Sequence, residues 1–233
     1  LGFSGPREIV SRALSGRRSR LVGAASLLIV PHLVYAFGTG TFSTSALVTL
    51  ALYVAVPTAL ILLVRQSAVG ATWLDGLAVL ALWLPFDLRF IQGVWTWPDG
   101  VGGYAASTLV AVDIGLLLFL GWRRIEAVGY TFRIRLQDLR IAIVNLAIFA
   151  VIAIPLATTI GFIELRDSAP APLGFATSWI TLLLFVALPE EFLFRGLIQN
   201  FLQRWMGKGW PVLLLAAVIF GAAHLDNDGF PNY

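Results

Sequence analysis

Long apolar segments make up most of the chain, and short polar or basic stretches separate them. Most of these segments approach the roughly 20 residues that a helix needs to cross the hydrocarbon core of a bilayer. The pattern therefore predicts an all-α fold, a polytopic bundle of transmembrane helices with about seven spans. The predicted spans cover residues 21–37, 46–64, 73–86, 104–122, 139–163, 175–202 and 210–225.

The composition is that of a membrane protein, and it excludes several other classes of protein and of chemistry. Only 12% of the 233 residues are charged and the mean hydropathy is +0.85, whereas soluble domains carry about 25% charged residues. The sequence has no cysteine, which excludes disulfides and thiolate chemistry. The basic residues lie between apolar segments and form no patch, so we expect no nucleic-acid partner. We expect an integral protein of the plasma membrane of a prokaryote, surrounded by the lipid bilayer and without a cofactor.

The distribution of lysine and arginine predicts the orientation, because cytoplasmic loops collect these residues. With the N-terminus inside, 13 of the 16 basic residues fall in inner segments, and the outer loops hold only Arg89 and Arg166. We therefore expect a cytoplasmic N-terminus. The sixth span then runs from outside to inside, with Glu190 in its inner half.

Three regions follow from this pattern. Residues 1–20 form a basic cytoplasmic segment. Residues 21–137 hold the first four spans and a basic stretch, 130–137, that we expect along the inner membrane interface. Residues 138–233 hold the last three spans. The sequence starts without methionine and stops at Tyr233 directly after a span, so we expect the natural chain to continue and this third region to be incomplete.

The sixth span carries charges that a transmembrane helix seldom tolerates. Glu190 and Glu191 follow Pro189, and a charge near the bilayer interior costs several kcal/mol. Arg195 lies one helical turn after Glu191 on the same face, so these two residues can pair. Glu190 points about 100° away from Glu191, and one arginine need not neutralise both carboxylates.

The seventh span brings an aromatic ring and an imidazole to one face, because Phe220 and His224 are one helical turn apart. A glutamate whose charge is not cancelled can act as a general base on water. A histidine opposite it could orient that water or donate to an oxyanion. The two spans together favour water-dependent cleavage of an amide or ester inside the membrane.

A count of residues places these two groups at different depths. If the sixth span begins near Phe175, Glu190 lies about 22 Å along it, and His224 lies about 21 Å along the seventh span from the opposite side. In a hydrocarbon core of about 30 Å, straight helices would then miss by more than about 10 Å. The two groups meet only if the sixth span starts later or tilts, which Pro172, Gly174 and Pro189 would permit, or if the seventh span begins beneath the membrane surface.

Simpler roles stay open for these residues and for other polar groups in the spans. Glu191 and Arg195 could form a purely structural ion pair, and a histidine in a span often bonds a neighbouring helix. Asp113, in the middle of the fourth span, is a further candidate functional carboxylate. We expect His32 to be satisfied locally and Asn145 to bond a neighbouring helix.

The two motifs together resemble those of the CAAX prenyl protease and bacteriocin-processing family of intramembrane glutamic endopeptidases. The family motif Glu-Glu-x-x-x-Arg is matched by Glu190, Glu191 and Arg195, and the motif Phe-x-x-x-His by Phe220 and His224. The resemblance covers residues from about 179 to 225. It makes residues 138–233 a protease-like core.

The resemblance implies a role for each matched residue. Glu190 would activate water, and His224 would bind a second water or the oxyanion. Glu191 and Arg195 would form a supporting pair, and Phe220 would shape the pocket. The implied activity is cleavage of a membrane-tethered peptide or protein, in CAAX-type or leader-type processing. Family members carry a further His and an Asn or Asp on later helices, which this sequence does not show. We expect no metal, because the chain has only 2 histidines.

Two other classes of function stay open at this point. A catalytically silent relative could serve as a membrane scaffold or an immunity protein. A small proton-coupled transporter could use Glu190 and Asp113 as proton sites, although we find no inverted repeat of the kind that many transporters contain.

Overall fold

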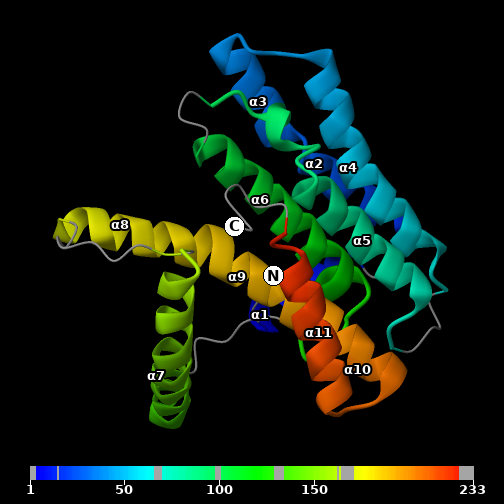
Figure 1. Ribbon diagram of the computed structural model, residues 1–233. Helices are drawn as coiled ribbons and strands as arrows, with labels where there is room; N and C mark the ends of the chain where they lie inside the picture. The colour runs from blue at the N-terminus through cyan, green and yellow to red at the C-terminus, as the bar shows by residue number, and fades with distance from the viewer. Residues whose placement is uncertain are drawn as a thin grey trace.

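The computed structural model describes residues 4–14, 16–65, 70–97, 101–128, 134–161, 163 and 171–225. This part of the chain contains helices and no strand, which confirms the all-α class (Figure 1). Element η1 is a short 3-10 helix, whereas η2, η3 and η4 are π-helical stretches within longer helices. In chain order the elements are α1 (Ser4–Leu14), α2 (Arg18–Leu27), α3 (Val30–Thr39), α4 (Thr44–Leu63), α5 (Trp73–Asp87), η1 (Gln92–Val94), α6 (Val101–Gly115), η2 (Leu116–Trp122), α7 (Leu136–Thr159), α8 (Pro172–Leu182), η3 (Leu183–Ala187), α9 (Leu188–Glu190), η4 (Glu191–Gln199), α10 (Asn200–Met206) and α11 (Trp210–Ala222).

Within the described ranges, 5 helical stretches are long and apolar enough to cross a membrane. They match predicted spans one, two, four, five and six, so the protein is an integral membrane protein. The predicted count of seven spans is not confirmed, because α5 has 15 residues and α11 has 13. At 1.5 Å per residue these two helices reach only about 20 Å, short of a hydrocarbon core of about 30 Å. The five stretches are Arg18–Thr39, Thr44–Leu63, Gly102–Trp122, Leu136–Thr159 and Pro172–Met206.

The core of the bundle forms where η2 meets α10. Every residue from Leu116 to Gly121 is buried, and the ring of Phe119 packs edge-on against that of Phe201, with centroids 5.8 Å apart. Helix α4 packs along α5, and α1 lies against η2. This apolar packing holds α10 in place, and with it the long helix that carries Glu190 (Figure 1).

A buried ion pair joins α5 to the end of η2. Arg123 donates from Nε and Nη2 to the two carboxylate oxygens of Asp75, at 2.7 and 2.9 Å, and from Nη2 to the Gly70 carbonyl at 2.7 Å. The Asp75 side chain is fully buried and also accepts from the N–H and hydroxyl of Thr72. The pattern Thr72-x-x-Asp75 is a capping box that the sequence displays. No sequence motif predicts the ion pair, because Asp75 and Arg123 are 48 residues apart.

Side chains tie several segments together at one end of the bundle. Arg7, Arg124 and Arg204 each donate to a main-chain carbonyl of another segment, within residues 125–126 or α1. Trp205 of α10 donates from Nε1 to the Ala71 carbonyl at 3.0 Å, beside the start of α5. All of these segments belong to the predicted inner side of the membrane, and the structure gathers them at one end.

Helix α7 stands away from the rest of the bundle (Figure 1). None of its residues is buried. The prediction that Asn145 bonds a neighbouring helix is wrong, since its side-chain amide donates to the Ile141 carbonyl of its own helix at 2.9 Å. A short polar side chain can satisfy its own donor with a carbonyl on the preceding turn of its helix. The predicted interfacial stretch 130–137 lies partly outside the described residues, and its last two residues begin α7.

His32 of α3 is not satisfied locally, which corrects a second expectation. The residue is buried, and neither ring nitrogen has a hydrogen-bond partner within the described part of the chain. Its ring packs edge-on against Trp95, with centroids 5.1 Å apart. The proline before His32 leaves no carbonyl that either ring nitrogen bonds within the described part of the chain. The packing against η1 and its flanks decides the environment of this histidine instead.

Candidate active site

One continuous helical stretch of 35 residues, Pro172–Met206, carries Glu190, Glu191 and Arg195. At 1.5 Å per residue it extends about 50 Å, well beyond a hydrocarbon core of about 30 Å. Pro189 has no N–H to donate, and π-helical stretches lie on both sides of it, η3 before and η4 after. Such stretches often occur at functional sites. The helix therefore changes its hydrogen-bond register at the two glutamates.

A tight turn brings α11 back along this long helix. Gly207, in the turn, has a φ of 87°, a left-handed value that favours glycine. Counted from the turn, Glu190 and His224 each lie about 15 residues away, or about 22 Å along their helices. They consequently reach the same depth, and the Nε2 atom of His224 lies 3.8 Å from Oε1 of Glu190.

The separation of more than about 10 Å, which straight spans counted from Phe175 would give, is therefore not present. That count measured Glu190 from an outer membrane boundary near Phe175, and the long helix need not enter the membrane there, because it exceeds the thickness of the core. Glu190 lies 18 residues from Pro172 and 16 from Met206, the two ends of the long helix, and its placement in the inner half of the span stays a prediction. Glu190 lies several turns from the Gly207 end, where the predicted inner loops gather.

The orientation of the His224 ring is held by its own helix. Its Nδ1 atom lies 2.8 Å from the carbonyl oxygen of Phe220, and a carbonyl can only accept, so Nδ1 carries the proton. In the neutral ring, Nε2 is then an acceptor that faces Glu190. The rings of Phe220 and His224 also pack together, with centroids 4.7 Å apart. A neutral His224 can thus orient a water, whereas donation to an oxyanion would need a second proton.

The ion pair predicted one turn apart is present on another face of the same helix. Arg195 Nη1 lies 2.9 Å from Oε1 of Glu191, and both side chains are substantially exposed. Neither residue lines the cavity that Glu190 faces. One arginine therefore pairs with one glutamate, and Glu190 has His224 as its charged or polar neighbour across the helix interface.

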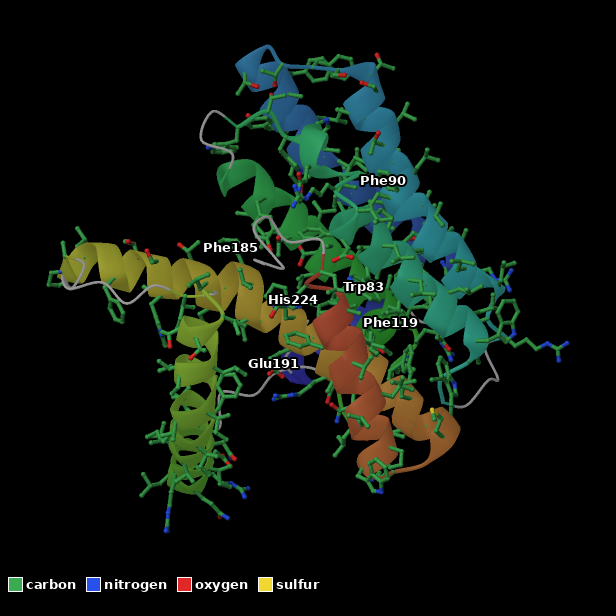
Figure 2. The ribbon with its side chains drawn as sticks, viewed as in Figure 1. Trp83, Phe90, Phe119, Phe185, Glu191 and His224 are labelled. Carbon is green, nitrogen blue, oxygen red and sulfur yellow. The ribbon has the colours of Figure 1, made fainter. Side chains whose placement is uncertain are left out.

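A cavity of about 250 Å³ opens beside Glu190 and His224. Figure 2 shows His224 at the end of α11, with Phe185 of η3 and Trp83 of α5 labelled on either side of it. Most of the lining is apolar, which suits an apolar ligand held by a few polar groups. Apolar lining residues include Leu82, Trp83, Phe86, Val112, Phe185 and Phe192, and the polar ones are Asp87, Arg89, Gln92, Tyr104, Thr108, Glu190 and His224.

Five of these polar residues were not predicted from the sequence as part of the site, and two of the five, Tyr104 and Thr108, carry hydroxyl groups. These two lie on α6, which faces Glu190 across the cavity. The signal in the sequence was a pair of hydroxyl side chains one turn apart near the start of the fourth span. Such a pair is a weak indication of a site, because hydroxyl groups in membrane helices commonly bond their own backbone.

Two further candidate residues, Phe220 and Asp113, do not line the cavity. Phe220 is not among the described residues that line the cavity, and its ring packs edge-on against Phe194, with centroids 4.9 Å apart. It contacts the site through the carbonyl that holds His224 and through its ring, which packs against the His224 ring. Asp113 does not line the cavity either, so a transporter that uses Glu190 and Asp113 together receives no support.

The comparisons with known proteins bear on the same part of the chain. The family model described as type II CAAX prenyl endopeptidase Rce1-like matches residues 172–233. The predicted resemblance is confirmed. The matched segment starts at the first residue of α8 and includes Glu190, Glu191, Arg195, Phe220 and His224. Neither a curated protein nor a solved structure matches the chain.

The chemistry open to this CAAX-endopeptidase-like segment follows from its donors. Among the described residues, no group of three or more His, Asp or Glu side chains could hold a metal ion. Glu190 and His224 are two acceptors separated by more than a direct hydrogen bond, which spans about 2.7–3.2 Å. A water that donates to both would sit between them, beside the apolar cavity. This arrangement can activate water against a ligand in the cavity.

Proposed function

We propose that this protein is an intramembrane endopeptidase that hydrolyses a peptide bond of a membrane-tethered substrate, with Glu190 as the base. The observation that supports it most is the 3.8 Å approach of His224 Nε2 to Glu190 Oε1 beside a cavity with apolar walls. The match of residues 172–233 to a family of prenyl endopeptidases supports the same class of reaction.

In the proposed reaction, Glu190 takes a proton from a water that also donates to His224 Nε2. The water oxygen attacks the carbonyl carbon of the substrate, a C–O bond forms, and the carbonyl electron pair moves to its oxygen. The resulting intermediate collapses, the C–N bond breaks, and the proton held by Glu190 passes to the leaving amine. The products are an amine and a carboxylic acid, which loses its proton to solvent to become a carboxylate, and no oxidant or further reactant is needed.

The apolar lining suggests where the substrate lies. Trp83, Phe86 and Phe185 form walls that would take apolar side chains or a lipid group attached to the peptide. Glu191 and Arg195 lie outside the cavity and would support the fold of the helix around Pro189 rather than touch the substrate. We infer a substrate held at the membrane, either a prenylated C-terminal tail or a leader joined to a membrane segment.

The decisive experiment uses the full chain in liposomes with two peptides, one prenylated with a CAAX-type end and one leader joined to a transmembrane segment. Cleavage in water enriched in oxygen-18 should place the label in the new carboxylate, as mass spectrometry would detect. Glu190→Gln should abolish cleavage at unchanged expression, because the amide cannot accept the proton. Asp138→Asn, an exposed carboxylate on α7, is the matched control and should retain activity.

Two results would contradict the proposal. Glu190→Gln could cleave both peptides at the rate of the unmodified protein, which would exclude Glu190 as the base. Alternatively, the unmodified protein could bind the peptides without releasing any labelled carboxylate, which would favour a silent scaffold over an enzyme. A loss of expression in Glu190→Gln would instead support a purely structural role for this carboxylate.

A further inference from the structure

The cavity beside Glu190 reaches the surface of the protein at one end of the bundle. Of the described residues that line the cavity, three are exposed, and all three lie where α5 is followed by η1 and α6. They form what we call the mouth of the cavity: Arg89, Gln92 and Tyr104. The ring of Tyr104 packs edge-on against Phe86 of α5, with centroids 5.6 Å apart. This contact holds the start of α6 against the end of α5 at the mouth.

The mouth lies at the end of α5 that is opposite to the arginine-rich end of the bundle. Near the start of α5, Asp75 pairs with Arg123, and Trp205 donates to the main-chain carbonyl just before the helix. Asp87, the last residue of α5, lines the cavity beside the mouth. The 15 residues of α5 extend about 22 Å at 1.5 Å per residue. The arginine contacts and the mouth are therefore separated by the length of this helix.

Aromatic side chains mark the end of the bundle that carries the mouth. The rings of Tyr35 and Trp97 stack with centroids 5.1 Å apart, and the Tyr35 hydroxyl donates to the Thr96 carbonyl. Trp97 follows η1, the short helix that begins with Gln92 of the mouth. Tryptophan and tyrosine gather where a membrane meets water. Water can therefore reach Glu190 through the mouth, from the side that the charge distribution predicts to be the outer one.

The backbone at Arg89 adds an independent observation. Its N–H donates to the Phe86 carbonyl at 3.1 Å, and the N–H of Phe90 donates to the Pro85 carbonyl at 2.9 Å. These two bonds end α5 in a Schellman motif, whose left-handed position usually holds glycine. Arg89 occupies that position with a φ of 61°. Arg124 is also left-handed, and its side chain donates to a carbonyl of α1. At Arg89 the side chain lines the mouth instead, and backbone outliers of this kind cluster at functional sites.

We propose that the substrate enters this cavity, and its hydrophilic product leaves it, from the outer side of the membrane through the mouth. The apolar part of the substrate lies along Trp83 and Phe185, and its hydrated chain passes the mouth, where the Arg89 guanidinium offers donors to main-chain carbonyl groups. The proposal rests on the endopeptidase function proposed above. It narrows the substrate to a chain whose cleaved bond is accessible from the outer side.

The chemical test uses Gln92→Cys, because the sequence has no cysteine and the introduced thiol is unique. Sealed liposomes hold the variant in both orientations, and the peptide that the unmodified protein cleaves is added outside. A bulky, membrane-impermeant maleimide added outside should lower kcat/KM by about 10-fold or more relative to the same variant before labelling, since kcat/KM includes the entry of free substrate. Thr41→Cys, exposed at the same end but outside the cavity lining, is the matched control. It should react equally and keep its kcat/KM.

The side of the membrane is tested on intact cells. Gln92→Cys should react with the same reagent before the cells are made permeable, as Thr41→Cys should. Reaction only after permeabilisation would overturn the outer side, and an unchanged kcat/KM of labelled Gln92→Cys would overturn the mouth as the entrance. Either result leaves the endopeptidase function standing when Glu190→Gln is inactive. Equal activity in Glu190→Gln and the unmodified protein would instead remove the function on which the proposal rests.

Discussion

At the scale of single residues, partners decide what each ionisable group can do. Glu190 and Glu191 are neighbours in sequence, yet one lies 3.8 Å from His224 beside the cavity and the other lies 2.9 Å from Arg195 outside it. Adjacent positions on a helix point in different directions. The pair of glutamates therefore separates into a candidate catalytic group and a member of an ion pair.

The ion pair predicts a non-additive effect on activity. Glu191→Gln and Arg195→Gln should each reduce cleavage partially, because either change frees the partner and disturbs η4. The double variant should lose no more activity than the weaker single variant, since both changes remove one interaction. Measured kcat/KM values for the four proteins form the cycle. Multiplicative losses would mean that the two residues act separately, against the contact in the structure.

The buried pair of Asp75 and Arg123 predicts a loss of stability away from the site. Asp75→Asn would leave Arg123 buried without its counter-charge, which typically costs about 3–5 kcal/mol. For a chain of this size we expect Tm in detergent to fall by about 6 °C or more. Asp138→Asn is the control, because Asp138 accepts from the Arg135 N–H in an exposed capping box. Equal shifts in Tm would show that capping, not the ion pair, is what Asp75 contributes.

At the scale of elements, the sequence predicts which residues share a helix face, but it does not predict which helices contact one another. The spacing of Phe220 and His224 predicts their shared face, and the structure joins them through a main-chain carbonyl and ring packing. The depth of Glu190 in the membrane stays a prediction, because no pattern in the sequence shows where a helix of 35 residues enters the membrane. Tyr104 and Thr108 were not predicted, because their place on the cavity wall depends on packing against other elements.

The contact of α6 with η4 predicts a steric requirement for glycine. A Cβ atom at Gly115 would lie 2.7 Å from Cε1 of Phe192, a buried ring two residues after Glu190. Gly115→Ala should therefore push η4 away from α6 and lower cleavage by about 10-fold or more, since small misplacements cost large factors in rate. Gly174→Ala in α8, where a Cβ atom meets nothing within 4 Å, should leave activity unchanged and is the control. Equal activity of the two variants would show that Phe192 moves freely.

At the scale of the whole molecule, one end is held by arginine side chains and the other by few polar contacts. Segments from the N-terminal region, from the ends of α5 and η2 and from α10 meet through donors to main-chain carbonyl groups. At the other end, the Tyr35 hydroxyl donates to the Thr96 carbonyl at 3.0 Å, near the loop between α3 and α4. The charge distribution predicts which end is cytoplasmic, and the fold supplies two ends that a chemical probe can distinguish.

The orientation can be tested directly, because the sequence has no cysteine and any introduced thiol is unique. Thr41→Cys and Thr96→Cys should react with a membrane-impermeant maleimide on intact cells. Arg17→Cys and Lys208→Cys should react only after the cells are made permeable. Thr96 also tests α5: labelling from outside requires this helix of 15 residues to cross the membrane, despite its length. The opposite pattern at all four positions would reverse the orientation. If Thr96→Cys reacts only after the cells are made permeable, as Arg17→Cys and Lys208→Cys should, then α5 does not cross the membrane.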